Sequence, residues 1–240
     1  MTLDTLVNLR DLGDGGPLPV SGMLLRSDAP LSGDRSPDLA AWPPGTVIDL
    51  RGAAERWEPH PLADTARVIE LPLLGGGSRH GSQSRPLRWP DRLADMYLRM
   101  VEPPLSDRLV EAITVIAESA PPVLVHCSAG KDRTGVTVAL TLRLVGVDHE
   151  AILDDYLLTD RAMPAVLARM RTTVREATEG TAMATPPPHI AATPREAMAE
   201  LLEAVDAYDG GATGWFLARG GSAETLELLR TRLLGPAPSV

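Results

Sequence analysis

The chain has one cysteine and one lysine among its 240 residues, and it is poor in aromatic side chains. A single thiol excludes an intramolecular disulfide, so stability must come from a packed core, which 44% hydrophobic residues can supply. An aromatic share of 3% argues against a nucleic-acid surface built on base stacking. No hydrophobic run approaches the length of a membrane span, so no transmembrane segment is expected.

Positive charge is also scarce, because 23 basic residues face 32 acidic ones and the formal net charge is −9. Such a chain has no general attraction to nucleic acids or anionic membranes, so any anion must bind at a local site. The first residues lack the apolar run of a secretory signal, and a free thiol suits a reducing compartment. We expect a cytoplasmic protein without a nucleic-acid partner, and signal-less secretion is the open alternative.

Short apolar runs bounded by turn residues predict strands, and helical patterns lie between and after them. The predicted strands are 22–26, 46–50, 67–71 and 122–126. The predicted helices are 91–101, 106–118 with Ser106 as N-cap, one from Arg133 to near Gly146, 149–158, 163–176, 194–208 and 223–234. This order implies an α/β fold with a central, mostly parallel sheet of four to five strands flanked by helices. We expect one domain over 1–240, with an α/β core at 1–148 and a helical part at 149–240.

The lone cysteine and lysine share the decapeptide His126-Cys127-Ser128-Ala129-Gly130-Lys131-Asp132-Arg133-Thr134-Gly135, between a predicted strand and a predicted helix. At a helix N-terminus, backbone N–H groups and the helix dipole favour a bound anion and the reactive thiolate form of a cysteine. Cys127 would meet a bound phosphate from one side while the Arg133 fork clamps two of its oxygens. The expected phosphate-binding residues are Ser128, Ala129, Gly130, Lys131, Asp132 and Arg133.

Neighbouring side chains have expected supporting roles. The Thr134 hydroxyl can donate a hydrogen bond to the sulfur, and His126 is expected to hydrogen-bond near the cysteine while pointing away from the phosphate. Lys131 stands alone among arginines, so it is predicted to hold a second phosphate or a carboxylate of the substrate, with a solvated charge as the alternative. The five histidines show no paired spacing that would predict a metal site.

A basic segment follows residue 75 in this acidic protein. It is either a solvated loop or the approach for a polyanionic substrate. Its charged members are Arg79, His80, Arg85, Arg88 and Arg92.

The decapeptide resembles the signature loop of the cysteine-dependent protein tyrosine phosphatase superfamily. Its Lys-Asp pair makes it most similar to the bacterial tyrosine and lipid phosphatases of broad specificity, typified by the mycobacterial phosphatase B. Segments 8–13, 25–28, 47–51 with Glu55, and 155–158 also fit this family. The resemblance implies a phosphate monoester hydrolase that needs no metal or cofactor and works through a phosphocysteine at Cys127.

The resemblance also implies what the protein acts on. The expected partner is a phosphotyrosine protein, a phosphoinositide, or both. A small phosphorylated metabolite is the alternative substrate, and a catalytically silent phosphate-binding module is the alternative function. A helical lid shields the cysteine in that family, so the C-terminal helices are either a lid or a cover for one face of the sheet.

Three aspartates compete for the role of general acid. Asp132 lies inside the loop, where related lipid phosphatases carry an aspartate thought to act as acid. Asp49 ends a predicted strand at the edge where α/β sites gather, and the family resemblance favours it too; its alternative is an ion pair with Arg51 or Arg26. Asp91 belongs to a Trp-Pro-Asp tripeptide typical of the acid loop of tyrosine phosphatases, and its alternative is the start of a helix.

Overall fold

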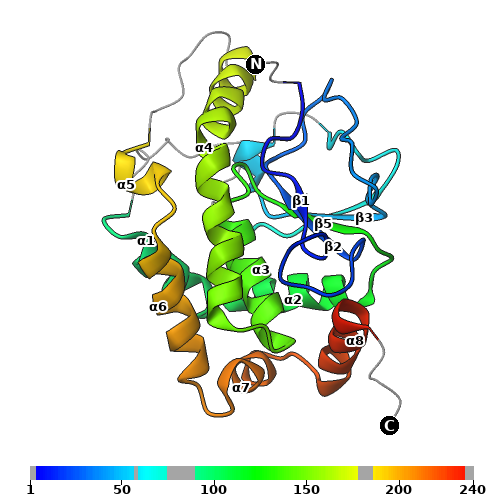
Figure 1. Ribbon diagram of the computed structural model, residues 1–240. Helices are drawn as coiled ribbons and strands as arrows, with labels where there is room; N and C mark the ends of the chain where they lie inside the picture. Colours follow the sequence, from blue (N-terminus) through cyan, green and yellow to red (C-terminus); the bar gives the residue numbers. More distant parts are fainter. Residues whose placement is uncertain (1–3, 57–58, 75–89, 178–185, 236–240) are drawn as a thin grey trace.

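The computed structural model of the protein describes residues 4–56, 59–74, 90–177 and 186–235. A five-stranded sheet has the order β1-β2-β5-β3-β4, and its neighbours are parallel except β1, which runs antiparallel to β2 (Figure 1). The strands are β1 (Arg10–Asp11), β2 (Leu24–Ser27), β3 (Thr46–Asp49), β4 (Arg67–Glu70) and β5 (Val123–His126). The predicted α/β fold with a mostly parallel sheet is confirmed. The sequence pattern does not predict β1, because two residues are too few to show a period.

Helices occupy most of the rest of the described chain. They are η1 (Ala53–Glu55), α1 (Leu93–Met100), α2 (Leu105–Glu118), α3 (Asp132–Leu144), α4 (His149–Ala177), α5 (Pro188–Ala191), α6 (Arg195–Asp206), α7 (Gly211–Ala218) and α8 (Ala223–Leu234). The sequence does not predict α5, which has four residues, or α7, whose first half contains two glycines that disfavour a helix.

Two of the predicted helix boundaries are wrong. The segments 149–158 and 163–176 form one helix, α4, which continues through Pro164. A proline removes one backbone hydrogen bond, but α4 packs against α3 and α6, and this burial outweighs that loss. The predicted N-cap, Ser106, is a buried residue inside the first turn of α2, and Pro104 occupies the cap position.

The two faces of the sheet bury different side chains, because successive residues of a strand point to opposite sides. Leu24, Ile48 and Val125 belong to the large core shared with the helices. Leu25, Val47 and Leu124 form a smaller cluster on the other face, covered in the described part of the chain by loop residues such as Trp42. The hydrophobic run of the central strand β5 reflects this burial on both faces.

The C-terminal helices pack mainly on other helices. The contacts join α6 to α1 and α4, and α8 to α2 (Figure 1). The indole nitrogen of Trp215 in α7 donates to the carbonyl of Val101 after α1 (3.0 Å). Residues from both predicted parts, such as Leu24 and Leu229, share one core, so the predicted boundary at 148 does not separate two cores.

Candidate active site

The decapeptide begins at the carboxyl edge of the central strand. Ser27 of β2 and Asp49 of β3 lie on either side of His126, the last residue of β5, and Cys127 follows directly. The helix α3 starts at Asp132. Residues 127–131 therefore form the predicted loop between strand and helix, at the edge where ligands bind in α/β sheets.

The carbonyl groups of this loop are held away from its centre. Four consecutive carbonyls each have a partner outside the turn. The pairs are Cys127 O with His126 Nδ1 (3.1 Å), Ser128 O with Ala29 N (3.1 Å), Ala129 O with Asn8 Nδ2 (3.1 Å) and Gly130 O with Arg26 Nη2 (2.8 Å). The C=O and N–H of a peptide unit point in opposite directions, so the N–H groups of 128–131 turn towards the loop centre. No described residue accepts a hydrogen bond from them, so they form a cradle for an anion.

Gly130 is required by the shape of this loop. Its φ of +69° lies in the left-handed region that side chains disfavour. A Cβ atom at this position would also overlap the carbonyl of Ser27 at the end of β2. The glycine therefore lets the loop lie directly against the neighbouring strand.

Arg133 points its guanidinium at Glu55 of η1. Its Nη1 and Nη2 donate to Oε2 (2.6 Å) and Oε1 (2.7 Å) of Glu55, and Nη1 also approaches the carbonyl of Leu50 (3.4 Å). The guanidinium has five N–H groups. The one on Nε and one of the two on Nη2 have no partner among the described residues. These two lie on one edge of the plane, in the fork arrangement that matches two phosphate oxygens.

Glu55 ties the two ends of the site together. It accepts from the hydroxyl of Ser128 (2.6 Å) and from the backbone N–H of Gly52 (2.9 Å). Burial alone would raise the pKa of Glu55, but the hydrogen bonds and charge of Arg133 lower it below its ordinary value. Glu55 is therefore ionised at neutral pH. The sequence assigned it no role, because its partner lies 78 residues away.

Cys127 is buried, with 2% of its surface exposed, and it is free of any disulfide. The hydroxyl of Thr134 is also buried and has no hydrogen-bond partner among the described residues, the sulfur included. The predicted hydrogen bond from Thr134 to the sulfur is thus not formed in this structure.

His126 points away from the loop into a small polar cluster. Its Nε2 lies 3.0 Å from Nε2 of His60, and Leu62 N–H donates to Nδ1 of His60 (3.1 Å). His60 must therefore carry its proton on Nε2 and donate it to His126, which in turn donates from Nδ1 to the carbonyl of Cys127. Burial lowers the pKa of His60 to about 4 and that of His126 to about 3, so both rings are neutral at pH 7.

The same cluster is where the described chain could hold a metal ion. The ligand atoms of Asp49, His60 and His126 lie within 4.8 Å of one another, although the sequence spacing indicated no such group. Metal binding through Nε2 of His60 would put a proton on its Nδ1, facing the N–H of Leu62. The oxygen of Asp49 nearest His126 already accepts from the backbone and Nε of Arg51. The existing hydrogen bonds therefore account for these atoms better than a metal ion does.

The three aspartates considered as general acids lie in different surroundings. Asp49 is fully buried and ion-paired with Arg51 (2.7 Å), which is the alternative raised for it from the sequence. Burial alone would raise the pKa of the Asp49 carboxyl, but the Arg51 guanidinium lowers it. Asp91 is exposed and precedes the N-cap of α1. Asp132 is the first residue of α3, within the signature loop, and 23% of its side chain is exposed.

Lys131 is buried, with 1% of its surface exposed. Its ammonium group donates to the carbonyls of Ile190 and of Ala192 (2.8 Å), and it lies 3.4 Å from Oδ1 of Asp132. The lysine that was expected to meet substrate therefore ties the loop to the end of α5. No local pattern reveals this contact, because its acceptors lie 59 and 61 residues away.

The outlying motifs of the resemblance support the loop from behind. Asp155 of α4 accepts from Arg10 (2.7 Å) and Arg26 (2.5 Å), and Arg26 reaches on to the carbonyl of Gly130. Asn8 donates to the preceding carbonyl, that of Ala129, and accepts from Arg10 (2.8 Å). These side chains therefore position the signature loop through its carbonyl groups.

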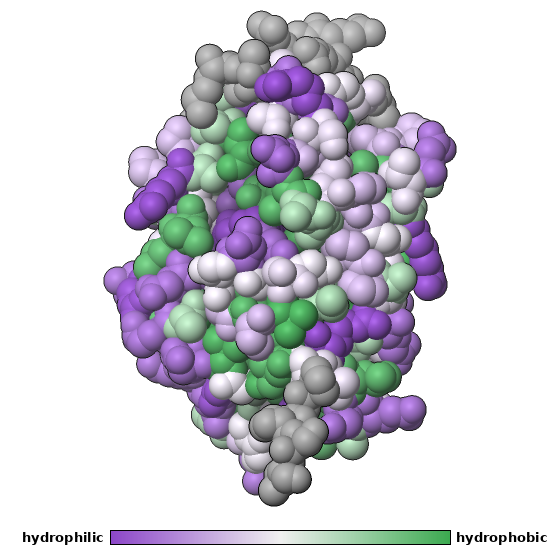
Figure 2. All heavy atoms as spheres, turned by 45° about the vertical axis from the view of Figure 1, so that its right-hand side comes forward, coloured by the Kyte–Doolittle hydropathy of each residue, from purple (hydrophilic) through white to green (hydrophobic). Residues whose placement is uncertain are grey.

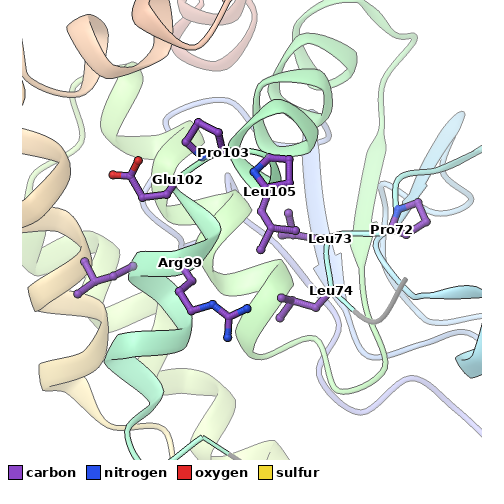
Figure 3. A pocket seen from close by; sticks show the side chains of 9 residues that line it. Pro72, Leu73, Leu74, Arg99, Glu102, Pro103 and Leu105 are labelled. Carbon is purple, nitrogen blue, oxygen red and sulfur yellow. The ribbon is translucent and has the colours of Figure 1, made fainter. Parts of the chain in front are cut away.

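Other surfaces lie outside this site. Of the basic segment, Arg79, His80, Arg85 and Arg88 fall outside the described residues, and Arg92 pairs with Glu200. A cavity of about 610 Å³ lies between residues 72–74 and the turn joining α1 to α2, where Arg99 extends towards Leu74 (Figure 3). None of its lining residues belongs to the signature loop.

Two features bear on membrane contact, namely the hydropathy of the surface and the length of the helices. On the face drawn in Figure 2, hydrophobic patches are separated by hydrophilic side chains. None of the helices in the described ranges is long and apolar enough to cross a membrane.

Known proteins of similar sequence include phosphatases, which agrees with a phosphate-binding loop. The triple specificity protein phosphatase PtpB of Mycobacterium tuberculosis is 32% identical over 118 residues, which are 49% of this chain and 42% of that protein. A tyrosine-protein phosphatase of Nostoc commune is 28% identical over 195 residues, 78% of this chain and 65% of that protein. The chain spans less than two thirds of either relative. The tyrosine phosphatase family matches residues 1–235, so the chain belongs to the tyrosine phosphatase family.

Proposed function

We propose that this protein is a phosphate monoester hydrolase of the tyrosine phosphatase type, with Cys127 as nucleophile. The observation that carries the proposal is the cradle of inward N–H groups at residues 128–131, with the open edge of Arg133 beside it. These groups supply the positive potential that an equatorial phosphate face requires, so no metal or cofactor is needed for that purpose.

The reaction proceeds in two displacements. The Cys127 thiolate attacks phosphorus as the bond to the leaving oxygen breaks, and that oxygen takes a proton from Asp132. Water then attacks the phosphocysteine, the sulfur leaves as thiolate, and the proton of the water passes back to Asp132. Asp132 is preferred as acid because Asp49 is ion-paired with Arg51 and Asp91 is exposed before the N-cap of α1, outside the loop.

Phosphotyrosine protein is the preferred substrate, ahead of phosphoinositide. A lipid headgroup with several phosphates needs several free cations, whereas the described cations behind the loop are engaged by protein groups. These are Arg10, Arg26, Arg51 and Lys131. We also propose one phosphatase domain over 1–240, a cytoplasmic location, and a lid role for residues 188–192, which Lys131 ties to the loop.

The test is hydrolysis of an aryl phosphate in the presence of a metal chelator by wild type and Cys127→Ser. Wild type should turn over and the variant should not. A wild type that is inactive, or a Cys127→Ser variant that keeps the rate, would overturn the proposal. Rates on a phosphotyrosine peptide and on a phosphoinositide then rank the substrates, and a higher kcat/KM for the lipid would reverse the order given above.

A further inference from the structure

Two buried tyrosines lie behind Asp132. The hydroxyl of Tyr97 in α1 lies 2.7 Å from Oδ1 of Asp132, and it also lies 2.7 Å from the hydroxyl of Tyr156 in α4. The two rings meet edge to face, with centroids 6.3 Å apart and planes at 88°. Both side chains are almost fully excluded from solvent. Side chains of α1 and α4 are therefore linked to the carboxylate at the start of α3.

The direction of the protons follows from counting donors. An ionised carboxylate only accepts, and when Asp132 carries its proton on Oδ2 its Oδ1 still accepts, so the single proton of the Tyr97 hydroxyl points to Oδ1 in both states. The Tyr156 hydroxyl must then donate to Tyr97. Burial and the nearby Asp132 charge raise the pKa of both phenols, so both keep their protons at neutral pH. The result is a hydrogen-bond chain from α4 through α1 to the first residue of α3.

This hydrogen-bond chain occupies one oxygen of Asp132 and leaves the other available. Oδ1 faces the Tyr97 hydroxyl and the Lys131 ammonium group (3.4 Å). No described residue donates to Oδ2, and 23% of the side chain is exposed. One oxygen is therefore fixed by the protein interior while the second is available to a substrate.

A glycine of α3 leaves room for the ring of Tyr156. Gly135 in α3 faces the Tyr156 ring, and a Cβ at this position would lie 3.2 Å from Cδ2 of that ring. Asp155, next to Tyr156, anchors Arg26 and through it the carbonyl of Gly130. The same turn of α4 thus supports both the phosphate cradle and the carboxylate.

We propose that Tyr97 and Tyr156 are positioning residues for proton transfer, which orient the Asp132 carboxylate so that Oδ2 meets the leaving oxygen of the substrate. This inference rests on the proposed phosphatase function. The inference predicts that loss of Tyr97 affects substrates differently according to their leaving group. A nitrophenolate leaves readily without a proton, whereas an unsubstituted phenolate or an alkoxide needs one, so misplacing the acid harms the second group selectively.

The experiment compares kcat/KM on p-nitrophenyl phosphate and on phenyl phosphate for wild type, Tyr97→Phe, Asp132→Asn and the double variant. Because kcat/KM covers steps only up to the first bond cleavage, a role of Asp132 in the later hydrolysis does not enter. Tyr208→Phe is the matched control, since it removes a hydroxyl that binds Arg219 in another part of the protein.

We expect Asp132→Asn to lower the phenyl phosphate value by roughly 100-fold or more, with a much smaller effect on p-nitrophenyl phosphate. Tyr97→Phe should lower the phenyl phosphate value by about tenfold and change the p-nitrophenyl value less than about threefold, which is the effect of one charge-assisted hydrogen bond. In the double variant, Tyr97→Phe should add nothing to the effect of Asp132→Asn, and Tyr208→Phe should match wild type on both substrates.

Three outcomes would overturn the inference: equal losses on both substrates, no loss on either, or a full Tyr97→Phe effect in the Asp132→Asn background. If Tyr97→Phe does not fold, judged by its thermal unfolding, Tyr156→Phe is put through the same comparison, with a smaller selective loss expected. Failure of the phosphatase function itself would be seen separately, as turnover that survives Cys127→Ser.

Discussion

Replacing Glu55 with glutamine tests whether the pairing of Arg133 with Glu55 is needed for the loop to bind and hydrolyse a phosphate ester. Each oxygen of Glu55 now accepts two hydrogen bonds, one of them from Arg133. The other two donors are the Ser128 hydroxyl and the Gly52 N–H. Glutamine has one accepting oxygen and one donating NH₂ group, so in either orientation one arm of Arg133 faces another donor.

The size of the effect follows from that lost arm. A hydrogen bond to a charged group contributes about 1.5–3 kcal/mol when it is buried. The Arg133 side chain is 13% exposed and that of Glu55 is 33% exposed, so solvent screening favours the lower part of that range. A loss of about 2 kcal/mol corresponds to a decrease of about 30-fold in kcat/KM.

The assay is hydrolysis of p-nitrophenyl phosphate, together with the Kd for orthovanadate as an oxyanion probe. In Glu55→Gln, kcat/KM should fall and the Kd should rise, while the far-ultraviolet circular dichroism stays that of wild type. Glu70→Gln is the matched control, because Glu70 pairs with Arg56 (2.9 Å) at the surface and should leave both values unchanged. If Glu55→Gln stays within twofold of wild type in both measurements, the assigned role of the Glu55–Arg133 pair is wrong.

Three further predictions concern stability. Gly130→Ala combines a strained φ with an overlap against β2, so urea unfolding should show a loss of about 3 kcal/mol or more, and a loss below about 1 kcal/mol would contradict this. Asp49→Asn leaves the buried Arg51 without its counter-ion, so the same measurement should show a loss of about 3–5 kcal/mol, whereas an unchanged midpoint would refute the ion pair's importance. The unfolded state binds more protons than the folded state between the ordinary histidine pKa of about 6.5 and the folded values of about 4 for His60 and about 3 for His126. The free energy of unfolding should therefore fall as pH drops from about 6.5 towards 4, by up to about 1.4 kcal/mol per pH unit for the fully buried His126, and His60→Asn should flatten this slope.

Local patterns predict much of this fold. The strands β2, β3, β4 and β5 are short apolar runs between turn residues, and these features depend only on neighbouring residues. The decapeptide holds a cysteine and an arginine six positions apart between an apolar run and a helical pattern, so its place between β5 and α3 is predictable too. The confirmed parts of the predicted fold are therefore those whose geometry is set within about ten residues.

Contacts between distant segments cannot be read from the sequence. No local pattern links Lys131 to its carbonyl acceptors, which belong to a segment 59 to 61 residues later. His60 and His126 share no spacing that suggests their contact at 3.0 Å. Tyr97 is one apolar position among several in α1, and only the packing of α1 against α3 brings its hydroxyl to Asp132. The unpredicted roles all depend on packing between elements.

The central claim is that Cys127 becomes covalently phosphorylated during turnover. The most direct measurement is rapid acid quenching of the wild-type protein during hydrolysis of an aryl ester of radiolabelled phosphate, followed by mapping of the labelled peptide. The label should lie on the peptide that contains Cys127, since the chain has one cysteine, and it should be absent in Cys127→Ser. Turnover that continues with no label on that peptide at any quench time, or a Cys127→Ser protein that still turns over, would contradict this account.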